Sequence, residues 1–322
     1  MLLVTVVALA IAAVGLVALR GCREPVCDPV HYPPGGIRIS TGGVGGVYEA
    51  YGLAFEEVLA DELPELRVRV DNSSGSVDNL TRLAGGRADL TFISADTAFR
   101  IPALEEAAGA PGRIRAVARI YDEYVQVVVR QDAPIRTLSD LRGKRVSVGS
   151  QGSSVEITAR RLLAAAHMDD NRDIVRRGYG VSESARLLAA GDLDAFFWVG
   201  GLPTAAVATL AGTVPIRLLP IERYVATLQG QYGSFYQLAT VPEGTYTGVP
   251  DTRTAAVPSY LLASRALDDD LVYRLTAALF SHRTRIADVV PSGRVLDVRS
   301  AISTATVPLH PGAVRYYRSV KP

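Results

Sequence analysis

The chain is poor in cysteine, in aromatic residues and in excess charge of either sign. Its 322 residues include only two cysteines, Cys22 and Cys27, and both lie near the N-terminus. The remainder is therefore not a disulfide-bonded scaffold. The 34 basic and 33 acidic residues leave a net charge of +1, and aromatic residues make up 7%. This balance provides neither a general nucleic-acid-binding surface nor an acidic tail, so we expect no nucleic acid among the partners.

The sequence also lacks the signatures of common catalytic and metal sites. It contains no G-x-x-x-x-G-K-[ST] phosphate-binding loop and no G-x-S-x-G nucleophile elbow. No cysteine follows residue 27, so the body has no cysteine nucleophile. The histidines show no metal-ligand spacing, and we expect each to be a surface or loop residue: His31, His167, His282 and His310. We therefore expect no catalytic residue, no metal and no cofactor.

One long apolar run opens the chain. Residues 2–19 carry no charge and would span about 27 Å as a helix, which is just enough to cross a bilayer. We interpret residues 1–21 as a signal peptide or membrane anchor. Residues 22–36 contain paired proline and paired glycine and are typical of a linker.

The end of this run resembles a lipoprotein signal, with Cys22 as the lipidated residue, although Arg20 departs from that pattern. Lipidation, an uncleaved anchor and ordinary cleavage all remain open, and a Cys22–Cys27 bridge would exclude the first. All three place the body outside the cytoplasm. The basic residues Arg20 and Arg23 follow the run, and by the charge rule they favour the opposite orientation.

Two similar α/β units follow one another in the body. In each unit a strand runs into a turn rich in glycine or serine, at residues 41–46 and 150–154, and this turn opens a helix. Later in each unit a helix leads through the pattern G-x-x-D-x-x-F into another strand, at residues 86–92 and 191–197. The repetition predicts an α/β fold with two lobes, each built on a mostly parallel sheet flanked by helices.

Apolar stretches between the units are candidate crossings between the two lobes. Residues 124–130 are typical of a strand that leads from the first lobe to the second, and residues 237–244 are a candidate return crossing. Two crossings would leave the first lobe discontinuous. We therefore expect residues 37–127 and 242–322 to form lobe 1 and residues 128–241 to form lobe 2.

The two turns are the strongest chemical signal in the sequence. Each joins a strand end to a helix start, where backbone N–H groups lack helical partners and the helix dipole is positive. Such a site binds a carboxylate or phosphate without a basic side chain. Ser153 and Glu156 also fit a capping box, so the alternative is that Ser153 only caps its helix. A partial dinucleotide fingerprint begins at Gly43 and Gly45, but Tyr48 replaces its third glycine, which makes a nucleotide cofactor the weaker hypothesis.

The segment Thr41-Gly42-Gly43-Val44-Gly45-Gly46-Val47-Tyr48 resembles the G-G-x-x-G-x-Y turn of TAXI-type solute-binding proteins. These are the extracytoplasmic receptors of tripartite ATP-independent periplasmic (TRAP) transporters. Further matches follow in the same order at residues 75–80, 87–90, 94–96, 135–146, 152–156 and 309–313. The resemblance implies a two-lobed periplasmic-binding-protein fold of the second type, with the ligand held between the lobes.

Carried over by position, the resemblance implies ligand-binding residues in both lobes. In lobe 1 these are Gly43, Gly46, Tyr48, Ser76, Ser94 and Asp96, and Thr41 of the same turn is a further candidate. In lobe 2 they are Gln151, Ser153, Ser154, Gly200 and Gly201. Trp198 is a further candidate because it lies at the strand end where ligands bind in open α/β sheets. Trp198 has a role in core packing as its alternative. Two positions depart from the family pattern: Glu49, where a second aromatic residue is common, and the Ser150-Gln151 pair.

The resemblance also implies the function. The ligand would be a small organic acid, either a glutamate-like amino acid or a dicarboxylate, and the partner would be a TRAP-type membrane permease. We expect a monomeric receptor outside the cytoplasm, tethered to the membrane through its N-terminus, and not an enzyme. The alternatives are a membrane-tethered ligand sensor and an enzyme on the same fold, because fold alone does not fix function.

Overall fold

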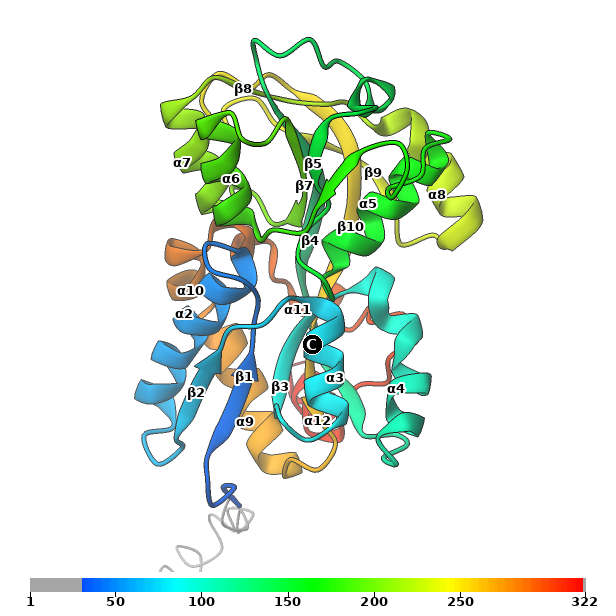
Figure 1. Ribbon diagram of the computed structural model, residues 1–322. Helices are drawn as coiled ribbons and strands as arrows, with labels where there is room; N and C mark the ends of the chain where they lie inside the picture. The colour runs from blue at the N-terminus through cyan, green and yellow to red at the C-terminus, as the bar shows by residue number, and fades with distance from the viewer. Residues whose placement is uncertain (1–30, 321–322) are drawn as a thin grey trace, which may run out of the picture. The chain divides into compact units, whose positions relative to one another are not determined.

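The computed structural model describes residues 31–320 (Figure 1). The predicted signal or anchor segment at residues 1–21 and the candidate lipidation site Cys22 lie outside the described residues, as does most of the predicted linker. Among the helices of the described part, none is long and apolar enough to cross a membrane.

The strands all belong to one sheet. They are β1 (Ile37–Ser40), β2 (Val68–Asp71), β3 (Leu90–Ser94), β4 (Ile114–Arg130), β5 (Arg145–Ser147), β6 (Val175–Arg177), β7 (Ala195–Gly200), β8 (Ile216–Leu218), β9 (Gln237–Val241) and β10 (Thr252–Ser264). The strand order is β2-β1-β3-β10-β4-β7-β5-β6, with β8 paired to β4 and β9 paired to β10.

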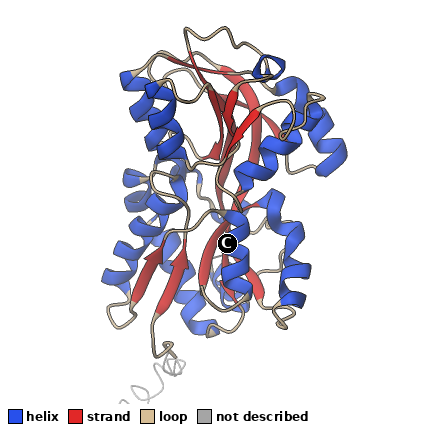
Figure 2. Cartoon of the chain, in the orientation of Figure 1, coloured by secondary structure: helices blue, strands red, loops and turns tan. Residues whose placement is uncertain are grey.

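Helices lie on both faces of this sheet (Figure 2). The α-helices are α2 (Val47–Glu62), α3 (Ser76–Ala84), α4 (Ile101–Ala107), α5 (Ser154–Ala165), α6 (Val181–Ala190), α7 (Ala205–Thr213), α8 (Val225–Tyr232), α9 (Asp269–Ser281), α10 (Arg283–Val289), α11 (Val298–Ala301) and α12 (Pro311–Ser319). Short 3₁₀ helices are η1 (Ala95–Arg100), η2 (Leu138–Leu141), η3 (Glu222–Tyr224) and η4 (Pro291–Val295).

The sheet combines parallel and antiparallel pairing. β1 pairs in parallel with β2 and β3, and β5 pairs in parallel with β6 and β7. These are the pairings that a strand–helix–strand order produces, because the helix carries the chain back to the same end of the sheet. The long strands β4 and β10 lie between the two groups and pair antiparallel with each other. We call β1–β3 with their helices the first half of the sheet, and β5–β9 with their helices the second half.

The two long strands carry the chain between these halves. β4 pairs with β10 along its first part and with β7 and β8 along its second, so the apolar stretch 124–130 does lead into the second half. The return passage lies in β10, which pairs with β9 at residues 252–256 and with β3 at residues 259–263. The expectation that residues 237–244 make this passage is therefore wrong, because β9 only extends the second half. The lobe boundaries themselves stay a prediction.

The apolar stretch in β4 is buried on both of its faces. Val127 and Val129 belong to the core cluster that also holds Leu162 of α5, whereas Val128 belongs to a second cluster with Leu188 of α6. Side chains alternate between the two faces of a strand, so a strand covered on both faces needs apolar residues at every position. This requirement explains why residues 127–129 are all valine, although the buried Gln126 interrupts the apolar stretch.

The internal repeat is reproduced in atomic detail. In the first half, Arg38 donates its backbone N–H to Asp89 Oδ2 (2.8 Å) and a guanidinium N–H to the carbonyl of Gly86 (2.7 Å). In the second half, Arg145 donates in the same way to Asp194 Oδ2 (2.7 Å) and to the carbonyl of Gly191 (2.7 Å). The aspartate of each G-x-x-D-x-x-F motif thus connects two neighbouring strands, which is a structural role.

His310 lies in a loop, which is one of the two expected places, but it is not at the surface. It is fully buried, and its Nδ1 accepts a hydrogen bond from the backbone N–H of Gly312 at the start of α12 (3.2 Å). Burial lowers the pKa of His310 to about 4. A histidine was not recognised as a helix cap in the sequence because serine, threonine, aspartate and asparagine are the usual capping residues.

Candidate functional site

A cavity lies between the two halves of the sheet, and about 530 Å³ of space in and around it, open solvent included, is free of protein atoms. The lining from the first half and from β4 is Gly42, Gly43, Gly46, Val47, Tyr48, Ser74, Gly75, Tyr121 and Glu123. The lining from the second half is Gly149, Ser150, Ser153, Ser154, Val155, Tyr179, Gly180, Val181, Trp198, Val199 and Gly200.

The N-termini of α2, α3, α5 and α6 meet at this cavity. Their N-cap residues are Gly46, Gly75, Ser153 and Gly180, and each of these lines the cavity. Helix N-termini carry unsatisfied N–H groups and the positive end of the helix dipole. The convergence of several such termini makes the cavity favourable for a carboxylate or another anion.

The two turns that open α2 and α5 share one construction. The carboxylate of Glu49 accepts a hydrogen bond from the backbone N–H of Gly45 (2.7 Å), and that of Glu156 accepts one from Gly152 (3.0 Å). Each glutamate stands in the first turn of its helix and holds the glycine before the N-cap. Glu49, which departs from the family pattern, is therefore part of the turn. Ser153 does cap α5, since its Oγ accepts a hydrogen bond from the N–H of Glu156 (3.2 Å).

The two halves of the sheet contact each other beside the cavity. Ser182 donates its hydroxyl to the carbonyl of Val44 (2.7 Å). On the other side, the backbone N–H groups of Val77 and Asp78 donate to the carbonyl of Gly152 (3.1 and 3.2 Å). The first free N–H groups of α3 are thus occupied by the second half, whereas the first residues of α2 and α5 line the cavity.

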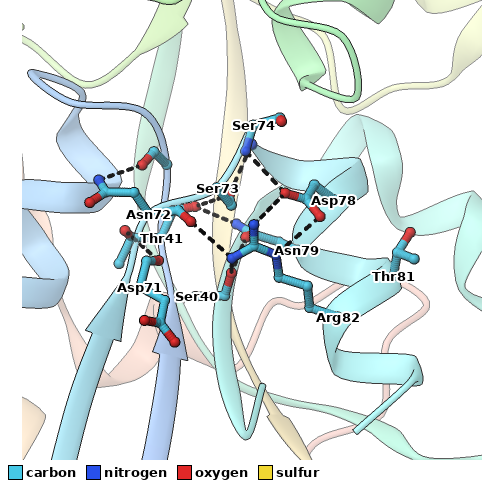
Figure 3. Close-up of polar contacts among 12 residues, drawn as sticks. Ser40, Thr41, Asp71, Asn72, Ser73, Ser74, Asp78, Asn79, Thr81 and Arg82 are labelled. Carbon is cyan, nitrogen blue, oxygen red and sulfur yellow. Dashed lines mark hydrogen bonds and ion pairs between the residues drawn. The ribbon is translucent and has the colours of Figure 1, made fainter. Parts of the chain in front are cut away.

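A polar network behind the first turn fixes its backbone (Figure 3). Asn79 donates to the carbonyls of Thr41 and Phe92 and accepts from the hydroxyl of Ser40 (2.7 Å). Arg82 forms an ion pair with Asp78 (2.8 Å) on the same helix. Thr41 and Ser76 both belong to this buried layer and not to the cavity lining. The carbonyl of Thr41 accepts the hydrogen bond from Asn79, and Ser76 Oγ accepts one from the N–H of Ser94 (3.0 Å).

Aromatic side chains form much of the cavity wall. Tyr48 stacks on the buried ring of Phe92, with 5.4 Å between the ring centroids. Trp198 is held by a hydrogen bond from its indole N–H to the hydroxyl of Thr204 (2.8 Å), so its ring orientation is fixed. Tyr121 and Tyr179 complete the set. These rings give the cavity rigid apolar surfaces that also attract cations.

Glu123 is the only carboxylic acid among the lining residues in the described part of the chain. Its side chain is 2% exposed, and its Oε2 has no hydrogen-bond partner in that part. Burial raises the pKa of Glu123 to about 8, although the hydroxyls of Tyr48 and Ser94 act in the opposite direction. An acid with this pKa is mostly protonated at neutral pH, and a nearby positive charge would ionise it.

The structure brings part of the predicted site together at the cavity. The predicted residues that line it are Gly43, Gly46, Tyr48, Ser153, Ser154, Trp198 and Gly200. The predicted residues that do not line it are Thr41, Ser76, Ser94, Asp96, Gln151 and Gly201. Gln151 is exposed, and the others in this second group are buried. The roles of all these residues in ligand binding stay predictions.

Asp96 lies in a buried cluster that joins the two halves. Its Oδ2 accepts hydrogen bonds from Tyr236 (2.9 Å) and Thr158 (3.0 Å) and forms an ion pair with Arg161 (3.4 Å). The Arg161 guanidinium also lies 4.4 Å from the ring centroid of Tyr232. Burial raises the pKa of Asp96, and Arg161 opposes that rise. The Oδ2 atom of Asp96 thus binds side chains of the second half.

Sequence reasoning missed Tyr121 and Glu123 on β4. Side chains two positions apart lie on the same face of a strand, so these two reach the cavity together. The signal available in the sequence was an acidic residue inside a strongly apolar strand. The lining residues Ser74, Gly75 and Gly180 were missed as well. The serine- and glycine-rich loop at residues 72–76 was recognised as the start of a helix, but Ser76 was the residue named from it.

No three His, Cys, Asp or Glu side chains within residues 31–320 gather in a way that could hold a metal ion. The two α/β halves, the paired crossing strands and the cavity between the halves define the class: this is a periplasmic-binding-protein fold of the second type, as expected. The chain belongs to the NMT1-like family, whose sequence model matches residues 39–320.

Solved structures of other proteins are also similar to this chain. A protein of Bordetella bronchiseptica RB50 has 18% identity and a TM-score of 0.50, with 89% of this chain and 90% of that chain covered. The periplasmic aliphatic sulphonate binding protein SsuA of Escherichia coli has 18% identity and a TM-score of 0.49, with 90% and 84% covered. An ancestral arginine-binding protein bound to arginine has 16% identity and a TM-score of 0.49, with 81% and 98% covered. At 18% identity and a TM-score of 0.50, the likeness to the Bordetella protein concerns the fold alone.

Proposed function

We propose that the protein is an extracytoplasmic solute receptor that binds a small organic acid in this cavity and delivers it to a TRAP-type permease. One observation carries the proposal: the N-termini of α2, α3, α5 and α6 converge on the cavity. They provide electrostatic attraction for a carboxylate where the described lining holds no arginine, lysine or histidine. The membership of the TAXI type and the permease partner are inferred from the resemblance of the sequence.

The arrangement of the halves supports a receptor that opens and closes. In this proposal lobe 1 is residues 37–127 and 242–322, lobe 2 is residues 128–241, and the lobes move about β4 and β10. The contacts between Ser182 and Val44, and between Gly152 and the start of α3, would break when a ligand enters. Domain closure of this type is a common way for a protein to enclose a small ligand and change its outer surface.

The lining favours binding over catalysis. It includes serines but no histidine, lysine or cysteine among the described residues, so no nucleophile and general base stand together there. Glu123 alone could transfer a proton, but the described lining holds no second carboxyl group, histidine or lysine that would complete an acid–base pair with it. We therefore propose a binding protein that does not turn over its ligand.

The proposal is tested by thermal unfolding of the full-length protein with a panel of acids: glutamate, glutamine, aspartate, succinate, malate, 2-oxoglutarate and pyruvate. A ligand present at a hundred times its dissociation constant stabilises the native state by about 2.7 kcal/mol, which gives a clear rise in the unfolding temperature. We expect at least one acid to do so. If the well-folded protein shows no shift with any of them, the binding of small organic acids is refuted.

A further inference from the structure

The cavity presents two different chemical environments to a ligand. The N-caps Gly46 and Ser153 bring the positive ends of α2 and α5 to the lining. The same lining includes the carboxyl group of Glu123 and the rings of Tyr48 and Tyr121. The first environment favours a negative group. The second favours a positive one, because a carboxylate and the faces of aromatic rings both attract cations.

The charge of the lining favours a zwitterionic ligand over a dicarboxylate. A dicarboxylate would bring two negative charges into a cavity whose described lining has no basic side chain and one acid. Its second carboxylate would be desolvated without a cationic partner, which is unfavourable. A zwitterion brings one carboxylate and one cationic nitrogen, and each meets an environment of opposite sign.

We propose that Glu123 binds a cationic nitrogen of the ligand, so that the ligand is a zwitterion with an ammonium group beside its carboxylate, as in an amino acid. This inference rests on the proposed function and names the ligand class of the same cavity.

None of the groups around Glu123 provides the positive charge that the ligand would bring. Tyr121 and Asp122 precede it on β4, Tyr48 faces it from α2, and Ser259 lies close to Tyr48 on β10 (3.5 Å between the hydroxyl oxygens). From β3 and η1 it is approached by the hydroxyl of Ser94 and by the carboxylate of Asp96. Arg161 is already paired with Asp96. The hydroxyls can donate hydrogen bonds, but none of these groups supplies a positive charge to Glu123.

The proposal predicts how affinity depends on pH. The pKa of Glu123 is raised to about 8, so the acid is mostly protonated in the empty protein at pH 7. When the cationic nitrogen binds, Glu123 releases its proton to solvent and a carboxylate–ammonium pair forms. Well below that pKa, the affinity should therefore rise about tenfold for each pH unit. If a neutral Glu123 instead donated a hydrogen bond to a ligand carboxylate, the affinity would fall as the pH rises through 8.

The decisive experiment is calorimetric titration of the full-length protein with matched pairs of ligands at pH 6 and pH 7. Each pair differs mainly by exchange of the ammonium group for a keto group: glutamate against 2-oxoglutarate, and alanine against pyruvate. We expect the nitrogen-containing member of at least one pair to bind at least tenfold more tightly than its partner, with an affinity that rises about tenfold from pH 6 to pH 7. This comparison uses the wild-type chain and does not depend on the folding of any variant.

A pair of variants tests the residue itself. Glu123→Gln keeps the shape of the side chain and should reduce the affinity for the zwitterion at least tenfold and remove its pH dependence. Glu222→Gln is the matched control, because Glu222 also has a buried carboxylate oxygen without a partner but does not line the cavity. We expect it to leave affinity unchanged.

The possible failures are distinct. If 2-oxoglutarate, pyruvate or succinate binds as tightly as the amino acids, or if Glu123→Gln retains full affinity, the inference is overturned and the proposed function stands. If none of the acids binds the folded protein, the proposed function fails and the inference fails with it.

Discussion

Replacement of Asp96 by alanine should lower the free energy of unfolding by about 3 kcal/mol. The side chain of Asp96 is fully buried, and the Arg161 side chain that pairs with it is 12% exposed. Loss of one partner of a buried ion pair costs about 3–5 kcal/mol, because the other charge stays buried without compensation. The hydroxyls of Thr158 and Tyr236 also lose their acceptor. The stacking of Arg161 on Tyr232 remains, and this places the expected loss at the lower end of that range.

Denaturant unfolding of the full-length protein measures this loss. Asp192→Ala is the control, because Asp192 is exposed and should change the free energy of unfolding by no more than about 0.5 kcal/mol. Asp96→Asn should fall between the two, since the amide oxygen can still accept a hydrogen bond. A loss below about 1 kcal/mol for Asp96→Ala would mean that the cluster does not hold the halves together.

The cluster shows why Asp96 was predicted from the sequence to line the ligand site, although it lies outside the cavity lining. The residue follows β3, at the end of the sheet where ligands bind in open α/β folds, so a ligand role was a reasonable expectation. Its partners Thr158, Arg161 and Tyr236 lie more than sixty positions later in the chain. No local pattern indicates that an arginine on α5 will reach this carboxylate. Only the packing of the two halves brings the groups together.

Features that depend on local sequence were predictable. The repeated G-x-x-D-x-x-F motif identified two α/β units, and the structure gives Asp89 and Asp194 the same hydrogen bonds in each. The turns that open α2 and α5 were likewise predictable, because a strand that is followed by small residues and then by an amphipathic pattern usually leads through a turn into a helix. Four residues of these turns that were named from the sequence lie in the cavity lining, and their role in ligand binding stays a prediction: Gly43, Gly46, Ser153 and Ser154.

Features that depend on distant contacts were not predictable in this way. Glu123 belongs to a strand whose apolar character suggested only a crossing between lobes, and its exposure to the cavity depends on how β4 lies between β10 and β7. The return passage in β10 was also missed. β9 and β10 both contain apolar residues that are compatible with a strand between the two halves. Only their pairing shows that β10, which contacts both β9 and β3, makes the return passage.

Replacement of Gly43 by leucine should weaken ligand binding by about tenfold to a hundredfold without loss of stability. Gly43 lines the cavity in the first turn, and a Cβ atom placed there meets no atom within 4 Å. Its φ angle is not in the left-handed region, so a side chain introduces no backbone strain. The leucine would occupy space that the ligand needs beside the start of α2. Overfilling a site of this kind costs about 1–3 kcal/mol, and each 1.4 kcal/mol corresponds to a factor of ten in affinity.

Two comparisons make this result specific. Gly230→Leu adds the same side chain at an exposed position of α8, where a Cβ atom also meets nothing within 4 Å. It should leave affinity unchanged and raise stability by no more than about 1 kcal/mol, because leucine favours a helix more than glycine does. Gly45→Leu should instead destabilise the fold, because Gly45 has a φ of +78° and its Cβ would lie 2.3 Å from Ser182 Oγ. Calorimetric titration with the acid that binds wild type, together with thermal unfolding, separates the three variants. If Gly43→Leu binds that acid with unchanged affinity, the ligand does not contact the first turn, and anion binding by the N-terminus of α2 is refuted.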